Sequence, residues 1–154
     1  AHLDDARSLG GWQGELTSDP TWKGSPAALL LSPVENRYWG LLASAPTGRL
    51  RAFRAMPDLY VQFSVWSEKT TKILFETLNG TQNKEFKRGL PDAPAGRWKT
   101  YTIPIMELTT YYDPGKHPIR EGDLLKDLEV YVGEPGESFK VVIDEVVVFR
   151  KLYD

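Results

Sequence analysis

The chain has 154 residues, a formal net charge of −2 and no cysteine. A single domain of this length buries about 70% of its unfolded surface, so we expect one domain over residues 1–154 whose core needs no disulfide. The absence of cysteine also excludes thiolate metal sites and a cysteine nucleophile. The 19 Lys and Arg residues are scattered among 21 Asp and Glu, which argues against a nucleic-acid partner, because such binding needs a concentrated positive face. No apolar run approaches the roughly 18 to 20 residues of a membrane helix, so no membrane partner is expected.

Side chains alternate with a period of two along much of the sequence, which is typical of strands with one buried face. Turns rich in Pro and Gly separate the alternating segments, and Asn79-Gly80 favours a hairpin turn of type I′. We expect no long helix, only a short helical turn at residues 123–127. Eight short strands without a helix indicate an all-β sandwich or barrel. The predicted strands are residues 27–31, 37–43, 49–55, 59–66, 72–77, 99–105, 128–132 and 139–149.

The segment 59–66 has the clearest alternation. Its aliphatic and phenylalanine side chains face one way and are predicted to be core. The other side presents Tyr60, Gln62 and Trp66, a mixture of rings and an amide that suits sugars, because a flat ring stacks on a pyranose while amides take its hydroxyls. The alternative is that Tyr60 and Trp66 pack beneath a loop or a second layer.

Further candidates for a ligand-binding surface come from other segments. Glu76 lies opposite Ile73 and Phe75, and Tyr131 lies opposite its apolar neighbours. If these strands lie beside segment 59–66, the side chains form one face. The loop pair Tyr111 and Tyr112 is then expected to act as a lid or rim, since such loops often carry function. The face would consist of Tyr60, Gln62, Trp66, Glu76 and Tyr131.

Two adjacent aromatic residues, Tyr38 and Trp39, fall within the predicted strand 37–43. Neighbouring residues of a strand point to opposite faces, so one ring is expected in the core and the other outside it. The sequence leaves open which one is buried.

Catalytic signals are weak. There are only two histidines, His2 and His117, so the sequence does not favour a histidine metal centre or a Ser-His-Asp triad. No carboxylate pair is singled out by its spacing for glycoside hydrolysis. We therefore predict no catalytic residue and no catalytic cofactor, with a lyase or hydrolase acting on glycans as the alternative.

The last predicted strand carries an Asp144-Glu145 pair in a β-branched run. The two carboxylates of a regular strand point to opposite faces, so one of them is expected to need a cation or several donors. Calcium suits such a position, because it takes hard oxygen ligands from carboxylates and backbone carbonyls. A salt bridge to Arg or Lys is the alternative.

The order of several short segments resembles the galactose-binding-like jelly rolls, a superfamily that includes many carbohydrate-binding modules attached to bacterial polysaccharide-degrading enzymes. The resemblance covers most of the chain and implies a two-sheet antiparallel sandwich. The segments that carry it are Leu3-Asp-Asp, Gly11-Trp12, Lys23-Gly-Ser-Pro-Ala-Ala-Leu29, Gly96-Arg-Trp-Lys-Thr-Tyr-Thr-Ile-Pro104 and Val142-Ile-Asp-Glu-Val146.

The same resemblance implies a structural calcium ion held by Asp5, Asp144 and the carbonyls near Lys23 and Gly24. It also implies a non-catalytic module that binds a polysaccharide or oligosaccharide, secreted or extracellular, and part of a larger multimodular protein. The superfamily contains members that bind no sugar, so fold alone does not decide function. A structural or protein-interaction domain is therefore a further alternative.

Overall fold

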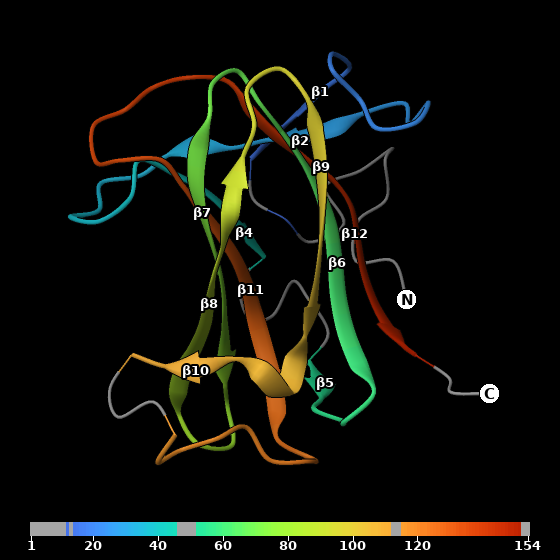
Figure 1. Cartoon of the computed structure of the whole chain (residues 1–154), viewed down its shortest axis with the longest axis vertical. Coiled ribbons are helices and arrows are strands. Elements are labelled where there is room, and N and C mark those ends of the chain that lie inside the picture. Colours follow the sequence, from blue (N-terminus) through green and yellow to red (C-terminus); the bar gives the residue numbers. More distant parts are fainter. Residues whose placement is uncertain (1–11, 13, 46–51, 112–114, 152–154) are drawn as a thin grey trace.

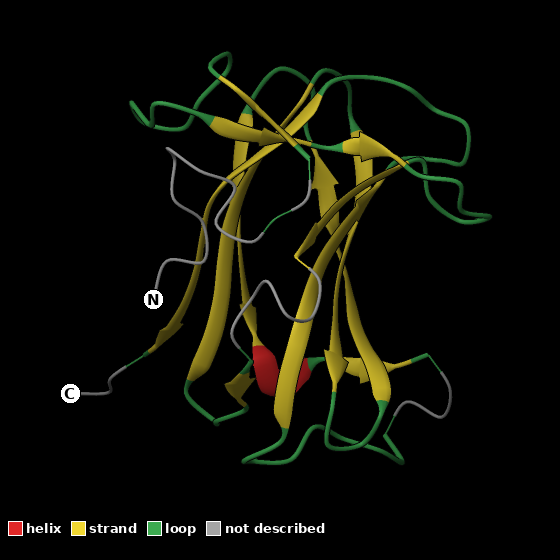
Figure 2. Cartoon of the chain, turned by 180° about the vertical axis from the view of Figure 1, so that it is seen from behind, coloured by secondary structure: helices red, strands yellow, loops and turns green. Residues whose placement is uncertain are grey.

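The computed structural model describes residues 12, 14–45, 52–111 and 115–151. Its strands form two sheets that face each other across a common core (Figures 1 and 2). The pairs within each sheet are antiparallel. The all-β, two-sheet antiparallel sandwich expected from the sequence is therefore confirmed. Among the described residues, no helix is long and apolar enough to span a membrane.

The first sheet has five strands, with β12 (Val141–Arg150) at its centre. The second sheet has seven strands, with β7 (Thr71–Asn79) and β11 (Leu124–Val132) at its centre, and β5 (Phe53–Arg54) pairs with β11 outside its main path. A single turn of 3-10 helix, η1 (Ile105–Glu107), follows β9. In spatial order the five-stranded sheet is β1 (Glu15–Thr17), β2 (Ala28–Leu30), β12 (Val141–Arg150), β6 (Leu59–Ser67) and β9 (Trp98–Pro104). The rest of the seven-stranded sheet is β10 (Thr109–Thr110), β8 (Lys84–Ala93), β7 (Thr71–Asn79), β11 (Leu124–Val132), β4 (Leu41–Ala45) and β3 (Ser32–Pro33).

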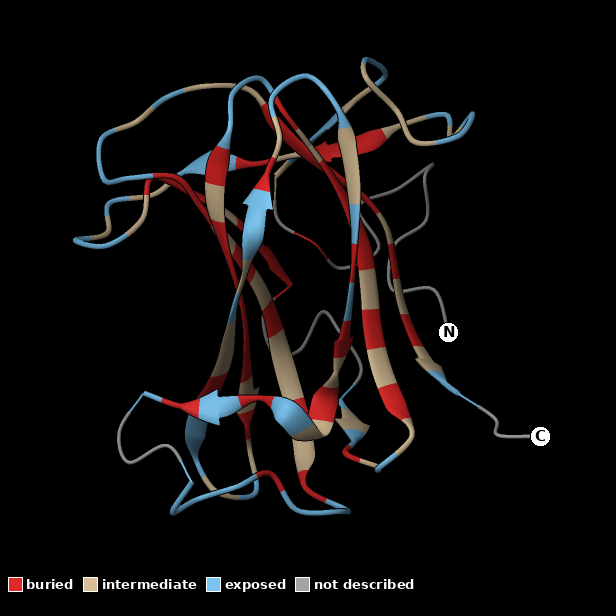
Figure 3. Cartoon of the chain, viewed as in Figure 1, coloured by how far each residue is buried: buried red, intermediate tan, exposed pale blue. Residues whose placement is uncertain are grey.

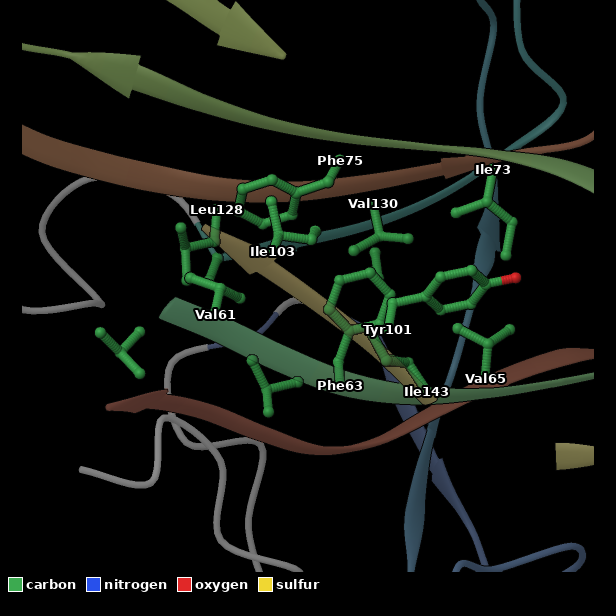
Figure 4. Packing of buried hydrophobic residues seen from close by; sticks show 14 of the residues in the cluster. Val61, Phe63, Val65, Ile73, Phe75, Tyr101, Ile103, Leu128, Val130 and Ile143 are labelled. Atoms are coloured by element: carbon green, nitrogen blue, oxygen red, sulfur yellow. The ribbon is translucent and has the colours of Figure 1, made fainter. Parts of the chain in front are cut away.

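The core lies between the sheets, and aromatic rings cross it (Figure 4). Phe63 of β6 packs against Phe75 of β7 with ring centroids 6.1 Å apart, and against Tyr101 of β9 at 5.6 Å. Buried and partly exposed residues alternate along β6 (Figure 3), as the period of two requires. The inward set is the one that the sequence predicts for residues 59–66, namely Leu59, Val61, Phe63 and Val65.

Strand β8 is absent from the sequence prediction because its many charged residues leave no clear alternation of apolar and polar side chains. Of its ten residues only Phe86 and Ala93 are buried, since much of its polar face is turned toward solvent. Pro91 is accommodated at a register shift against β7, where a missing N–H costs no ladder hydrogen bond.

Two other local predictions are corrected. The expected helical turn at 123–127 is instead the start of β11, with Asp127 in a bulge at φ 55°. The predicted strand 37–43 begins only at Leu41, so Tyr38 and Trp39 belong to the preceding loop. Neither ring enters the core, contrary to the expectation that one of them would.

The hairpin at Asn79-Gly80 is confirmed, but the type I′ turn is not: the loop spans residues 80–83, and neither Asn79 nor Gly80 has the positive φ that a type I′ turn requires. Asn79 is the last residue of β7 and is fully buried. Its Oδ1 accepts hydrogen bonds from the backbone N–H groups of Thr81 and Gln82. Asn79 therefore holds the loop that joins β7 to β8.

A buried carboxylate ties this hairpin to the chain before β11. The Oδ2 atom of Asp123 accepts hydrogen bonds from Asn79 Nδ2 at 2.7 Å, Gln82 Nε2 at 2.7 Å and the backbone N–H of Arg120 at 2.9 Å. Burial alone would raise the pKa of Asp123, but these donors outweigh it and lower the pKa. The network fixes the end of the sandwich formed by the two loops.

Replacing Asp123 by Ala should lower the free energy of unfolding by about 1 to 3 kcal/mol, because the buried amide of Asn79 loses its acceptor. This corresponds to a fall in melting temperature of roughly 2 to 4 °C per kcal/mol, measurable by calorimetry. Glu121→Ala, an exposed change in the same loop, is the control. Equal melting temperatures for both variants would contradict the network's role.

Candidate functional site

The predicted ligand-binding residues are divided between the two sheets. Tyr60, Gln62 and Trp66 lie on β6, whereas Glu76 lies on β7 and Tyr131 on β11. Because β6 belongs to the five-stranded sheet and β7 and β11 to the other, the expectation that all five share one face is wrong. The alternation within each strand was assigned correctly, but strand pairing cannot be obtained from alternation.

The outer face of the seven-stranded sheet carries a groove of about 810 Å³. Its walls come from β7, β8 and β11, from the loop before β4 and from the loop after β11. Glu76, Tyr111 and Tyr131 all line it, so the structure brings three of the predicted residues together. The four aromatic residues that line the groove are Tyr38, Trp39, Tyr111 and Tyr131.

Strand register places a row of polar side chains across the sheet beneath these rings. Glu76 of β7 lies directly opposite Lys87 of β8 on one side and Glu129 of β11 on the other. Glu129 in turn lies opposite Ser44 of β4. Directly opposite residues on one sheet face have Cβ atoms about 4.5 to 5.5 Å apart, so the two glutamates form a carboxyl pair at the centre of this face.

Glu76 is almost completely buried, with 5% of its surface exposed. The hydroxyl of Tyr111 donates a hydrogen bond to its Oε2 atom. Burial raises the pKa of Glu76 to about 7; the Tyr111 hydrogen bond acts in the opposite direction, and the nearby Glu85 and Glu129 raise the pKa further. Near neutral pH this carboxyl therefore exists in both protonation states.

Glu129 is also held by hydroxyl groups, one from its own strand and one from β4. Its Oε2 atom accepts a hydrogen bond from the Tyr131 hydroxyl at 2.7 Å, and Ser44 Oγ lies 3.5 Å from its Oε1. Burial raises the pKa of Glu129 as well. Sequence reasoning missed this residue, although its alternation with Leu128 and Val130 identified it as outward-facing as clearly as Tyr131.

The aromatic loop before β4 forms a rim of the groove. The Trp39 ring lies 6.1 Å from the Tyr131 ring, tilted by 40°, and Lys72 Nζ lies 4.4 Å from the Trp39 ring centroid. Lys72 also pairs with Glu134 at 2.9 Å and donates a hydrogen bond to the carbonyl of Tyr38. Lys72 therefore links the rim loop to the loop after β11.

Gly40 is required at the base of this rim. A Cβ atom at this position would collide with the backbone carbonyl oxygen of Glu134. The loop before β4 therefore packs directly on the loop after β11, which holds Tyr38 and Trp39 at a fixed edge of the groove.

The β6 candidates have a different environment on the outer face of the five-stranded sheet. Tyr60 stacks on Phe149 of β12, with centroids 5.6 Å apart and planes 20° apart. Gln62 accepts a hydrogen bond from Thr102 at 3.1 Å, and Trp66 lies opposite Trp98 in register. These contacts are made with neighbouring strands of the same sheet, β9 and β12.

The predicted calcium ligands are only partly described. Asp144, 2% exposed, accepts hydrogen bonds from the backbone N–H groups of Trp22 and Glu145 and lies 3.4 Å from Ser25 Oγ. It therefore contacts the turn that contains Lys23 and Gly24, whose φ values are 41° and 79°. The described residues contain no cluster of three or more metal-ligating His, Cys, Asp or Glu side chains. Asp5, and Tyr112 of the aromatic pair, lie outside the described residues.

The sequence matches no protein-family model and no curated protein. Solved structures, however, match nearly the whole chain. A family 11 carbohydrate-binding module from Clostridium thermocellum, in complex with a β-1,3-1,4-mixed-linked tetrasaccharide, is 20% identical with a TM-score of 0.60, covering 94% of this chain and 92% of its own. A family 28 module specific for non-crystalline cellulose is 13% identical with a TM-score of 0.58, covering 97% and 92%.

An exo-β-agarase is also similar, with 12% identity and a TM-score of 0.63, covering 93% of this chain and 22% of the agarase chain. Identities at this level establish a common fold. The chain therefore has the β-sandwich fold found in carbohydrate-binding modules, which agrees with the jelly-roll resemblance of the sequence.

Tyr111→Phe should raise the pKa of Glu76 above about 7, because the Tyr111 hydrogen bond lowers it. The measurement is an NMR titration of the glutamate carboxyl carbons. Tyr38→Phe, which removes a hydroxyl from an exposed ring, should leave the Glu76 titration unchanged. A Glu76 pKa that falls or stays constant in Tyr111→Phe would contradict the described contact.

Proposed function

We propose that this domain is a non-catalytic carbohydrate-binding module that binds a polysaccharide or oligosaccharide chain in the groove of the seven-stranded sheet. The observation that carries the proposal is one groove that combines four aromatic rings with the carboxyl group of Glu76. Rings offer flat apolar surfaces for pyranose faces, and carboxyl groups hydrogen-bond hydroxyls.

Each part of the groove has a defined role in this proposal. Trp39 and Tyr131, whose rings are neighbours, stack on adjacent regions of the glycan. Glu76 accepts hydrogen bonds from sugar hydroxyls, and Tyr111 holds its carboxyl group in place. Glu129, which does not line the groove, holds the hydroxyl of Tyr131. Tyr111, 42% exposed, contacts the chain at another part of the groove.

The structural neighbours support the same class of ligand. One was solved with a β-1,3-1,4-mixed-linked tetrasaccharide and another is specific for non-crystalline cellulose. The agarase match covers only 22% of that enzyme's chain, which supports a module within a larger protein. We further propose that this parent protein is secreted or extracellular, because polysaccharides are substrates outside the cell.

Trp39→Ala and Tyr131→Ala should each weaken glycan binding by about 10-fold or more, as truncation of a central aromatic anchor does at other interfaces. Affinity gels containing a panel of neutral polysaccharides identify the ligand, and calorimetry gives the dissociation constants. Tyr60→Ala and Trp66→Ala, on the other sheet, are the matched controls and should retain binding.

The opposite result, in which the Tyr60 and Trp66 variants lose binding and the Trp39 and Tyr131 variants retain it, would show that the site lies on the five-stranded sheet and would contradict the proposal. If no polysaccharide retards the protein, the proposal fails; oligomerisation or pull-down of a partner would then support a protein-interaction domain. Release of reducing ends or unsaturated sugars would identify an enzyme.

We also propose a structural calcium ion beside Asp144, with Asp5 and the carbonyls of Lys23 and Gly24 as the remaining ligands. The contact of Asp144 with the turn at Trp22 to Ser25 supports it, and calcium favours such carboxylate and carbonyl oxygens. Its role would be to fix the turn to β12, away from the glycan groove.

Chelation should lower the melting temperature by several degrees, because an ion that binds only the folded state stabilises it. The melt is recorded with EDTA and again after calcium is restored in excess. The Asp144→Asn variant should show no difference between the two conditions. An unchanged melting temperature of the parent protein in chelator would rule out the ion.

A further inference from the structure

Strand β8 carries a glycine, Gly89, beside the groove. We propose that Gly89 is a specificity-determining residue over which the glycan chain leaves the groove, so that the site binds chains long enough to extend from the Tyr131 ring to the edge of the sheet. The inference rests on the proposed function and deepens it, because it gives the bound chain a direction and a minimum length.

Neither backbone conformation nor packing requires a glycine at this position. A Cβ atom added to Gly89 would meet nothing within 4 Å, and its φ lies outside the left-handed region. Every other described glycine either has a positive φ or would place a Cβ atom 3.0 Å or less from a neighbouring atom. Gly89 is also paired one-to-one with Leu74, and the register shift between β7 and β8 lies beyond Leu90. Gly89 therefore marks no bulge.

A glycine weakens a strand, because it has no side chain to pack and loses more conformational freedom on folding than other residues. Within a strand it often marks a bulge or a place where a ligand or another backbone approaches closely. At Gly89 the regular pairing excludes a bulge, and the open space excludes a neighbouring backbone. Gly89 is exposed, so the approach of a ligand is the reason that remains.

The register of the sheet places Gly89 in line with the Tyr131 ring. Leu74 lies directly opposite Gly89 on one side and directly opposite Tyr131 on the other. Leu74 and Tyr131 line the groove, and Gly89 continues their row beyond it. Tyr131 and Gly89 are roughly 10 Å apart along this row, since they are separated by two strand spacings. A sugar over Gly89 is therefore a different unit of the chain from the sugar stacked on Tyr131.

Side-chain contacts close the groove on both sides of this row. On one side, the Tyr111 hydroxyl donates a hydrogen bond to Glu76 and so covers the floor of the groove. On the other side, Lys72 pairs with Glu134 at 2.9 Å and links two loops. A chain that lies in the groove is therefore directed along the row, across the strands.

The row is open where it reaches β8. Strand β10 pairs with β8 at Phe86 and Lys87 and at no later residue of β8. Among the described strands, β8 is therefore the edge of the sheet at Gly89. A side chain at position 89 would stand in this opening, whereas the bare backbone lets the glycan lie across it.

The test measures the binding of oligosaccharides of increasing length, prepared from the polysaccharide that binds best in the affinity screen. In the parent protein, affinity should rise with length until the chain extends from Tyr131 to Gly89. Gly89→Val should bind the longer oligosaccharides about 10-fold more weakly, because its side chain clashes with the path of the chain. The shortest oligosaccharide that binds should keep its dissociation constant. Gly89→Ala should show a smaller loss of the same kind.

Thermal melts separate this effect from damage to the fold. Valine favours strands, so the melting temperature of Gly89→Val should equal or exceed that of the parent protein. If Gly89→Val melts lower, Gly89→Ala decides the comparison. Lys84→Val, an exposed change on the same strand outside the groove, is the control and should bind every oligosaccharide as the parent protein does.

Parent-like binding of the longer oligosaccharides by both Gly89 variants overturns the inference and leaves the proposed function intact. Equal weakening at every length does the same, because Gly89 would then act on the groove as a whole. An affinity of the parent protein that does not rise with length also overturns the inference alone. Failure to bind any polysaccharide overturns both.

Discussion

The packing of two sheets through alternating side chains is the constraint on which the rest of this structure depends. Phe63 and Phe75 meet in the core. Each of them fixes which side chains of its own strand point inward, because a shift of one residue would turn every side chain to the other face. Once Phe75 and Val130 point inward, Glu76 and Glu129 must point outward beside each other. The groove is therefore a consequence of the core register.

The outward face then has to accommodate groups that water would stabilise better. Glu76 is withdrawn from solvent at the centre of the sheet, and the resulting cost appears as a raised pKa. Tyrosine hydroxyls from β10's end and from β11 satisfy the two carboxyl groups. Buried carboxyl groups with perturbed pKa values, held in place by hydrogen bonds, are characteristic of sites that bind ligands.

Sequence patterns were sufficient for the fold class and for the facing of most residues, but insufficient for the site. The alternation in β6 and β11 identified their inward and outward side chains correctly. It could not reveal that β6 pairs with β9 and β12 while β7 pairs with β8 and β11, since pairing is set by long-range packing and alternation is local.

The rim of the groove was hidden for a different reason. Tyr38 and Trp39 look like strand residues, yet their position depends on Gly40 packing against the carbonyl of Glu134, nearly a hundred positions away. The charged strand β8 buries only Phe86 and Ala93, which are too few and too far apart to give a recognisable alternation. The rim depends on a contact between distant segments, which local alternation does not reveal, whereas β8 is hidden by its own charged residues.

The central claim is that the glycan lies on the seven-stranded sheet, and NMR mapping tests it most directly. Backbone and tryptophan indole signals are followed while a neutral oligosaccharide is added. The account predicts shifts in β7, β8 and β11 and at the Trp39 indole, with little change in β6, β9 and β12. Shifts concentrated at Tyr60, Trp66 and Trp98 instead would contradict it.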